Sequence, residues 1–427
     1  MNKIMNPEKY SWKGILERPI QTLGDIEQLV NTVFEEVSGE GDKAVKRYTE
    51  QFDGVLLTDI FVAADEIVEA ISLVPQSLQK SIKTAKENIE KFHAAQRTSR
   101  IEVETTEGVQ CWQEKRPIEK IGLYIPGGTA PLFSTILMLA VPAALAGCKQ
   151  IVLCTPPNKQ GKIHPAILYT AQLCGIKQIY KIGGIQAIAA LTFGTDTVPA
   201  VYKIFGPGNQ YVTAAKQIAT KHGVAIDMPA GPSELLVAAD ETANASFVAS
   251  DLLSQAEHGT DSQVILVTTS RNFMLEVEKE VNAQLKALPR KAIAEKAIEN
   301  SKLILLENDR QAIELINEYA PEHFIICCRD EAYYLEHICN AGSVFIGNYT
   351  PESAGDYASG TNHTLPTNGY ARQYSGVNLD SFMKSITFQK ISETGLINIG
   401  PTIEVMAEAE GLMAHKNAVS IRLNSLK

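Results

Sequence analysis

The chain has 427 residues, of which 45% are hydrophobic and 21% are charged, and its formal net charge is −10. This length allows more than one domain, and this composition is typical of a folded soluble protein rather than a disordered one. The negative charge argues against a nucleic-acid surface and against a polybasic membrane patch.

The sequence lacks the patterns of a secretory signal, a membrane span and a disulfide framework. The first residues, Met1 to Pro7, have no apolar core and no cleavage pattern. The most apolar run, residues 136–146, is too short to span a bilayer and contains Pro142. The seven cysteines are odd in number and include no Cys-x-x-Cys pair. We therefore expect a cytoplasmic protein that binds neither membrane nor nucleic acid.

The chain is predicted to begin with an arm, followed by helices and a hairpin. Residues 1–20 show little periodicity, which indicates an arm. Apolar residues at helical spacing predict helices over 22–50 and over 64–95, the second broken at Pro75. Two alternating runs predict a β-hairpin over 101–114, with its turn at Glu107-Gly108.

Two series of short apolar strands alternating with helices follow the hairpin. Strands of the first series are predicted at residues 121–125, 151–154, 179–182, 201–205 and 225–227. Strands of the second series are predicted at residues 235–238, 264–267, 303–306, 324–326 and 343–346. Strands and helices that alternate with short loops predict parallel sheets with helices on both faces.

We therefore predict an α/β fold with two Rossmann-like, doubly wound domains, a small N-terminal arm and a C-terminal tail. The first α/β domain is discontinuous and consists of residues 21–120 and 236–380. The second consists of residues 121–235. Residues 381–427 form the tail, a mixed unit of strand and helix.

Glycines cluster at the predicted strand ends. The clusters are Gly127-Gly128, Gly183-Gly184, Gly206-Pro207-Gly208 and Gly231-Pro232. In open α/β sheets, ligands bind off the carboxyl ends of strands, and glycine lets the backbone approach phosphate. The usual dinucleotide fingerprint is absent, because Tyr211 stands where a third glycine belongs. Spacing alone therefore leaves two interpretations open, a dinucleotide site or simple tight turns.

Several polar side chains could bind a metal ion. Gln255 and His258 are three residues apart in a predicted helix that stops near Gly259, so they would share one helix face. Asp356 lies in a glycine-rich polar loop, and His415 lies near the C-terminus. An amide, two imidazoles and a carboxylate would form an all-N/O site suited to Zn²⁺, Mn²⁺ or Fe²⁺. Sequence separation does not show whether these groups converge, so a polar helix end remains the alternative.

The eight histidines fall into two groups. Four have polar helix or turn surroundings that suit structural roles: His93, His164, His222 and His337. Four lie among acids, glycines and polar loop residues: His258, His323, His363 and His415. Glu322 directly precedes His323 at the start of a predicted strand. An acid beside an imidazole suits proton transfer.

Seven short stretches carry a further signal: residues 122–135, 205–209, 227–234, 253–259, 320–324, 353–357 and 410–418. They include the runs Phe205-Gly-Pro-Gly-Asn and Ala320-Pro-Glu-His-Phe. Together and in this order, they resemble the histidinol dehydrogenase family over nearly the whole chain. We find no departure at the positions that this family uses for metal binding or catalysis.

The resemblance implies an enzyme of histidine biosynthesis that oxidises L-histidinol to L-histidine in two NAD-linked steps, through an aldehyde that is not released. It implies one Zn²⁺ per subunit, with ligands at Gln255, His258, Asp356 and His415. It implies an acid–base pair at Glu322 and His323, and NAD contacts at Tyr124, Gln186 and Asn209. It implies substrate contacts at Ser233, Gln255, His258, His323, Asp356, Glu410 and His415.

The resemblance also implies Rossmann-like domains of the incomplete kind, which fits the missing fingerprint. Members of the family are homodimers whose C-terminal tail reaches the other subunit. The tail of each subunit would therefore complete the site of its partner.

The residue types allow a mechanistic hypothesis. An imidazole, with a reference pKa of about 6.5, suits His323 as the group that removes the hydroxyl proton in the first oxidation. Glu322 would activate the water that hydrates the aldehyde, and the zinc ion would mainly hold the imidazole and amine of the substrate in place. Two other interpretations are a metallohydrolase with Glu322 as general base, and a non-catalytic nucleotide-binding or assembly protein.

Overall fold

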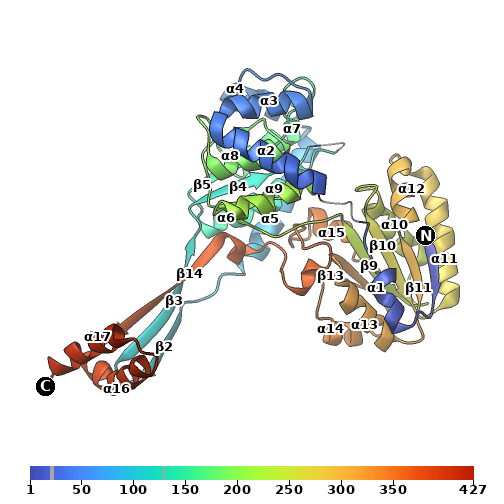
Figure 1. The fold of residues 1–427 in the computed structure, drawn as a ribbon. Helices are drawn as coiled ribbons and strands as arrows, with labels where there is room; N and C mark the ends of the chain where they lie inside the picture. The colour runs from blue at the N-terminus through green and yellow to red at the C-terminus, as the bar shows by residue number, and fades with distance from the viewer. Residues whose placement is uncertain (20–23, 128–129) are drawn as a thin grey trace.

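Three β-sheets organise the chain in the computed structural model, which describes residues 1–19, 24–127 and 130–427. Figure 1 shows two α/β domains and a thin arm that projects away from them. Two of the sheets are parallel, which confirms the predicted α/β fold. Thr22, in the predicted first helix, and Gly128, in a predicted glycine turn, lie outside the described residues.

The larger sheet has six parallel strands. In spatial order they are β1 (Asn2–Met5), β11 (Lys302–Leu305), β10 (Gln263–Thr268), β9 (Glu234–Ala239), β12 (His323–Cys327) and β13 (Ser343–Ile346). Every residue of β9, β10 and β12 is buried, as expected for central strands of a parallel sheet covered on both faces. The predicted N-terminal arm supplies the edge strand, because Asn2 to Met5 pair with Lys302 to Leu305.

Helices cover both faces of the six-stranded sheet. Leu235 and Val237 of β9 pack on one face, and Leu236 and Ala238 pack on the other, because successive strand residues point to opposite sides. The first face is covered by α10 (Ala245–Ala256), α11 (Arg271–Gln284) and α12 (Lys291–Glu299). The second is covered by α1 (Trp12–Ile15), α13 (Asp309–Tyr319) and α14 (Glu331–His337).

The second parallel sheet has five strands. In spatial order they are β6 (Gln178–Tyr180), β5 (Gln150–Cys154), β4 (Lys120–Tyr124), β7 (Lys203–Phe205) and β8 (Ala225–Ile226). One face is covered by α6 (Phe133–Ala146) and α7 (Pro165–Leu173). The other is covered by α8 (Gly184–Phe193) and α9 (Gln210–Lys221). The apolar run 136–146 is part of α6, whose first ten residues after Phe133 are all buried in this core.

Four helices near the N-terminus pack on this five-stranded domain: α2 (Gly24–Glu40), α3 (Asp42–Asp53), α4 (Ala64–Leu73) and α5 (Gln76–Ala94). Helices α2 and α3 contact α8, α4 contacts α7, and α5 contacts α6. The assignment of residues 21–120 to the domain of 236–380 is therefore wrong. Val30, Val33 and Val37 show an apolar helix face that needs a partner, but such a face does not encode which sheet covers it.

The projecting arm is a three-stranded antiparallel sheet built from two distant parts of the chain. Its strands are β14 (Met383–Ile391), β3 (Val109–Pro117) and β2 (Ile101–Thr106), in that order. The hairpin of β2 and β3 is the one predicted around Gly108, which has a φ of 81°. At the tip, α16 (Glu393–Ala409) and α17 (Met413–Asn424) pack against each other. Residues 101–117 therefore belong with the tail and not with either α/β domain.

The remaining elements are short: α15 (Glu352–Tyr357), η1 (Lys9–Ser11), η2 (Leu285–Ala287), η3 (Tyr370–Arg372) and η4 (Leu379–Phe382). Among the helices of the described residues, none combines the length and the apolar character that a membrane span requires.

Candidate active site

A cavity of about 590 Å³ lies where the two α/β domains face each other. On one side its wall includes Ser233, Glu322 and His323, at the amino ends of β9 and β12. On the other side its wall includes Tyr124 and Asn209, which lie at or beyond the carboxyl ends of β4 and β7. The cavity therefore lies between the amino ends of strands in the six-stranded sheet and the carboxyl ends of strands in the five-stranded sheet.

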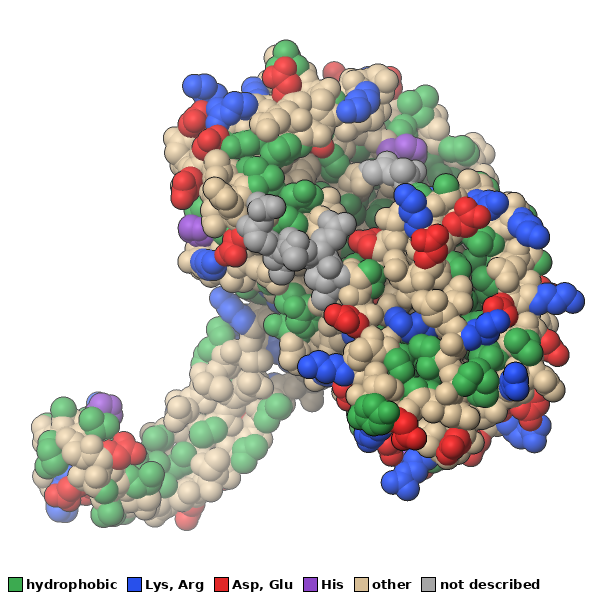
Figure 2. All heavy atoms as spheres, turned by 45° about the vertical axis from the view of Figure 1, so that its right-hand side comes forward, with side chains coloured by type: hydrophobic (Ala, Val, Ile, Leu, Met, Phe, Trp, Pro, Cys, Tyr) green, Lys and Arg blue, Asp and Glu red, His purple; other side chains and the backbone are tan. Residues whose placement is uncertain are grey.

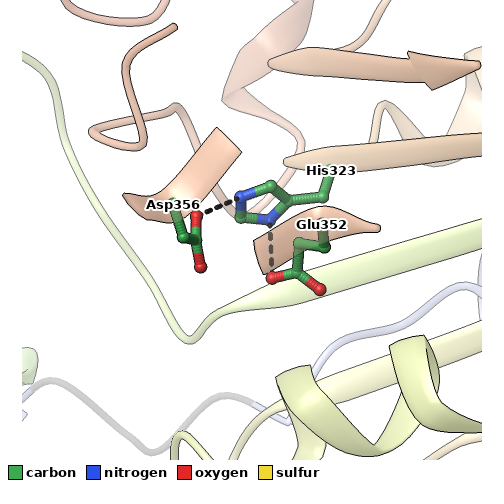
Figure 3. Close-up of side chains that lie close together, drawn as sticks. All are labelled: His323, Glu352 and Asp356. Atoms are coloured by element: carbon green, nitrogen blue, oxygen red, sulfur yellow. Dashed lines mark ion pairs between the residues drawn. The ribbon is translucent and has the colours of Figure 1, made fainter. Parts of the chain in front are cut away.

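His323 is the first residue of β12, and only 4% of its side chain is exposed. Its Nδ1 donates a hydrogen bond of 3.1 Å to the carbonyl oxygen of Glu234 on the neighbouring strand. Its Nε2 lies 3.6 Å from Oδ1 of Asp356, and its Nδ1 lies 3.7 Å from Oε1 of Glu352 (Figure 3). Oε2 of Glu322 is also 3.7 Å from Nδ1. One imidazole is thus enclosed by three carboxyl groups.

Burial and mutual charge shift the pKa of every member of this cluster. Burial alone would lower the pKa of His323, but the carboxylates raise it well above its usual value. Burial raises the pKa of Glu322 to about 8 and that of Glu352 to about 8. Burial also acts to raise the pKa of Asp356, but the nearby charge of a protonated His323 holds it below its usual range. Shifted pKa values that gather in a cleft are typical of a proton-transfer site.

Three of the four predicted metal ligands gather around this cluster. Gln255 lies in the last turn of α10 and is fully buried. With its amide turned to satisfy both neighbours, its nitrogen donates to Glu352 and its oxygen accepts a bond of 3.0 Å from the backbone N–H of Glu234. His258 and Asp356 line the cavity directly.

His258 is not on the helix that the sequence predicts for it. Helix α10 ends at Ala256, and His258 lies in the turn that follows, where its N–H donates to the carbonyl oxygen of Gln255 at 3.2 Å. Burial lowers the pKa of His258, so its imidazole is neutral near pH 7. A neutral imidazole is the form that binds a metal ion.

Glu410 and His415 lie in the arm, away from the cavity of their own chain. Glu410 follows α16, His415 lies in α17, and both side chains are exposed. Figure 1 shows these helices at the far end of the antiparallel ribbon. One chain therefore does not bring the four predicted ligands together in this structure.

Two of the three residues predicted to contact NAD, Tyr124 and Asn209, line a larger cavity of about 920 Å³ beside the five-stranded sheet, and Gln186 does not line it. Tyr124 and Asn209 line both this cavity and the one at His323, so the two cavities adjoin at these residues. The hydroxyl oxygen of Tyr124 accepts a bond of 3.1 Å from the N–H of Gly184. Gln186 is fully buried, and its amide donates to Asp53, which lines the cavity, at 3.3 Å.

Sequence reasoning missed two acidic residues of the cluster. Glu352 has 1% exposure and lies four residues before Asp356, a spacing that places both on one face of α15. Glu234 has 1% exposure and begins β9. A charged residue at the head of an otherwise apolar strand was a signal for the second, and helical spacing from Asp356 was a signal for the first.

His363 also reaches the site. It lines the cavity, and its Nδ1 donates to the carbonyl oxygen of Asp356 at 2.9 Å. Its Nε2 lies 3.1 Å from the hydroxyl of Thr135 in α6, on the other domain. The sequence placed this histidine in the group with polar loop surroundings but gave it no role in the site.

Comparisons with known proteins agree over the whole chain. A family profile described as histidinol dehydrogenase matches residues 16–423, which include both α/β domains and the arm. A histidinol dehydrogenase of Bacteroides thetaiotaomicron is 59% identical over 427 residues, covering 100% of both chains. One of Escherichia coli is 50% identical over 418 residues, covering 97% of this chain and 95% of the other. The crystal structure of histidinol dehydrogenase from Elizabethkingia anophelis matches with a TM-score of 0.98 and 61% identity, covering 100% of this chain and 98% of that one.

Proposed function

We propose that this chain, which belongs to the histidinol dehydrogenase family, oxidises L-histidinol to L-histidine in two NAD-linked steps. The observation that carries the proposal is the position of Glu322 and His323 in the cavity that Tyr124 and Asn209 also line. An acid–base pair thereby faces the space that we assign to the hydride acceptor. The family names the oxidation, and the site supplies the groups that move its protons.

The larger cavity fits a dinucleotide. Its lining includes turns after β4, β5 and β6, where the backbone lies open to a ligand at the carboxyl ends of parallel strands. The Oε1 atom of Gln186 is buried, with no hydrogen-bond partner among the residues that the structure describes. Gln186 is not among the described residues that line the cavity, so this acceptor lies behind the wall to which Asp53 belongs.

The cluster around His323 fits a zinc ion. His323, Glu352 and Asp356 each offer one ligand atom within 4.8 Å of the others, and no thiolate lies among them. We assign the metal to Gln255, His258 and Asp356, completed by His415 from a second chain, and we leave His323 free for proton transfer. When bound, zinc would supply a positive charge that holds the imidazole and amine nitrogens of histidinol and offsets the charge of Asp356.

His323 serves as the base of the first oxidation in its neutral form. A bound zinc ion would favour that form, because its charge would offset the carboxylates that raise the pKa of His323. Its Nδ1 proton is held by the carbonyl oxygen of Glu234, so Nε2 is the atom that accepts the proton of the alcohol. The carbon–hydrogen electron pair would leave as hydride to NAD⁺, for which we assign the larger cavity. The product is an aldehyde, and Nε2 of His323 carries the proton that the hydroxyl has lost. His323 releases this proton to solvent before the second oxidation, so that Nε2 is again free to accept one.

Glu322 serves in the second oxidation. The aldehyde has no hydroxyl proton to lose, so a water molecule must first add to its carbon. The Glu322 carboxylate accepts a proton from that water, and His323 accepts a proton from the hydrate as the second hydride leaves. The backbone N–H of Glu234 holds Oε2 of Glu322 at 2.8 Å, which leaves the other carboxylate oxygen for this task.

A homodimer would complete the site. The arm exposes apolar side chains along its strands and helices, as Figure 2 shows at its far end. They include Ile386, Ile391, Ile397, Val405, Met406, Leu412, Met413 and Ile421. A surface of this kind on a projecting ribbon fits burial against a second chain.

Stoichiometry tests the proposal. Purified protein given L-histidinol and NAD should form two molecules of NADH for each histidinol consumed, and a zinc chelator should abolish the reaction until zinc is restored. One NADH per histidinol would contradict the second oxidation. Turnover that no chelator affects would contradict the metal site.

A further inference from the structure

The backbone of one residue, Glu234, holds both residues of the proton-transfer pair. The backbone N–H of Glu234 donates to Oε2 of Glu322 at 2.8 Å, and its carbonyl oxygen accepts from Nδ1 of His323 at 3.1 Å. These contacts cross from the start of β9 to the start of β12, where the two strands are neighbours. The position of Glu234 therefore fixes the orientation of the Glu322 carboxylate and of the His323 imidazole.

The side chain of Glu234 is itself held by an arginine from the N-terminal segment. Nε and Nη2 of Arg18 donate to its two carboxylate oxygens at 2.5 and 2.8 Å, the paired geometry of a guanidinium and a carboxylate. The backbone N–H of Asn368 donates to Oε1 at 2.6 Å. Only 11% of the Arg18 side chain and 2% of the Glu234 side chain are exposed.

Arg18 is fixed as firmly as its partner. Its Nη2 also donates to the carbonyl oxygen of Tyr319 at 2.7 Å, and its guanidinium lies 4.0 Å from the centre of the Tyr319 ring. The hydroxyl of Tyr319 donates to Gln263 at 3.0 Å, on strand β10 beside β9. Arg18 thus connects α13 to Glu234, which lies at the amino end of β9 and contacts both Glu322 and His323.

We propose that Arg18 and Glu234 form a positioning pair that holds the backbone of Glu234 where its N–H and its carbonyl oxygen orient Glu322 and His323 for catalysis. The inference rests on the catalytic roles proposed above. A buried ion pair is a weak source of stability, because the cost of removing two charges from water offsets their attraction. Its geometry has a clearer consequence, since a shift of the Glu234 backbone would displace the carboxylate of Glu322 and the imidazole of His323 together.

The alternative is a purely structural role, in which Arg18 only fastens the N-terminal segment to the domain. Other ion pairs also fasten that segment: Nζ of Lys3 lies 2.9 Å from Glu278, and Nζ of Lys9 lies 3.0 Å from Glu314. Neither pair contacts Glu234 by any bond within the described residues. Lys3→Met is therefore a matched control that loosens the segment without touching the site.

The test compares Arg18→Met, Arg18→Lys and Lys3→Met for kcat, for the KM of histidinol and for the midpoint of thermal unfolding. Displacement of catalytic groups by about 1 Å costs up to roughly a hundredfold in rate, so Arg18→Met should lower kcat by roughly ten- to a hundredfold with KM changed by less than about threefold. Arg18→Lys keeps the charge but not the two parallel bonds, so it should restore the unfolding midpoint and not kcat. Lys3→Met should leave kcat unchanged.

A second measurement separates positioning from stability even where Arg18→Met weakens the fold. If Arg18 acts through the imidazole, Arg18→Met should lower kcat by less than about twofold in a His323→Asn background, because the two losses are not additive. Equal fold losses in both backgrounds would overturn the proposal. So would kcat values of Arg18→Met and wild type that agree at a temperature where both are folded. A wild-type protein with no histidinol-dependent NADH formation would instead overturn the proposed function.

Discussion

The two α/β domains share an architecture, but opposite ends of their strands face the cavity between them. The five-stranded domain presents the carboxyl ends of its strands, with Tyr124, Asn209 and open backbone turns. The six-stranded domain presents the amino ends of β9 and β12, with Glu322 and His323. Helices begin at the carboxyl ends of the strands in the five-stranded domain. The N–H groups of these helix starts and of the turns suit an extended polar ligand. In the six-stranded domain, buried side chains on the strands themselves face the ligand.

This difference assigns separate tasks to two copies of one kind of fold. The candidate NAD contacts Tyr124, Gln186 and Asn209 are neutral groups that can bind without changing protonation state. The residues around His323 are ionisable and have strongly shifted pKa values. We therefore expect substitutions in the six-stranded domain to affect the chemical steps, and substitutions in the five-stranded domain to affect NAD affinity.

The largest effect should come from His323→Asn. Both oxidations need its imidazole as a base, so kcat with histidinol and with the aldehyde should each fall by roughly a thousandfold. Steady-state kinetics with each substrate checks this, and His337→Asn, at an exposed histidine of α14, is the control. A loss confined to one oxidation would show that the six-stranded domain does not use one base for both steps.

The next effect concerns the arm, which belongs to neither domain. Proteins carrying His323→Asn and His415→Asn should each be nearly inactive. After subunit exchange at equal amounts, about half of the dimers are mixed and each has one intact site, so activity should return to about a quarter of wild type. Rates are measured before and after exchange. No recovery in samples where mixed dimers are demonstrated would contradict the shared site.

Glu322→Gln should separate the two steps within the six-stranded domain. Oxidation of the aldehyde should fall by roughly a hundredfold, because the water loses its base, while oxidation of histidinol to the aldehyde should fall by less than about tenfold. Single-turnover NADH formation with each substrate measures the two steps. Equal losses would contradict the assignment of water activation to Glu322.

The same carboxyl group predicts a pH dependence. Burial raises the pKa of Glu322 to about 8, and a general base acts only when it is deprotonated. Aldehyde oxidation should therefore be slow below this pKa and should rise as the pH increases through about 8. Glu322→Gln should remove that rise, and a wild-type profile that falls over the same range would have the wrong sign.

The smallest effect should come from Asn209→Asp in the five-stranded domain. Oδ1 of Asn209 caps α9 by accepting from the N–H groups of Tyr211 and Val212, and aspartate keeps that cap. The variant loses the amide N–H group and gains a negative charge that repels the pyrophosphate of NAD, so the KM for NAD should rise by up to about tenfold, with kcat and the unfolding midpoint nearly unchanged. A fall in kcat with no change in the KM for NAD would contradict the assignment of NAD binding to the five-stranded domain and of the chemical steps to the six-stranded domain.

The strands could be predicted from the sequence because the two parallel sheets are covered on both faces. A strand buried on both sides is a short apolar run, and β9 and β12 were predicted within one or two residues of their observed bounds. The partner of an amphipathic helix could not be predicted in this way. Helices α2 to α5 carry apolar faces that either sheet could cover, and only tertiary packing places them on the five-stranded one.

The candidate site was predictable where its residues are neighbours in sequence. Glu322 and His323 are adjacent, and Gln255 and His258 lie close together, so each pair is visible as a motif. The contributions of Arg18 and Glu234 depend on β9 lying beside β12, and strand order is not readable from apolar runs. The helix predicted to include His258 is shorter in the structure. Helix α10 ends at Ala256, Glu257 is its C-cap residue, and His258 lies beyond it.

The arm has a consequence for shortened versions of the protein. Strand β14 lies beside β3 along its full length, from Met383 opposite Pro117 to Ile391 opposite Val109. Ending the chain at residue 382 would therefore remove one of three strands and leave a lone hairpin of β2 and β3, which is marginally stable in water. The backbone of β3 would then become a bare edge open to pairing with other chains. Deleting the C-terminal segment would produce an aggregation-prone hairpin inside the chain, and a clean truncation must remove residues 101–117 together with the segment after 382.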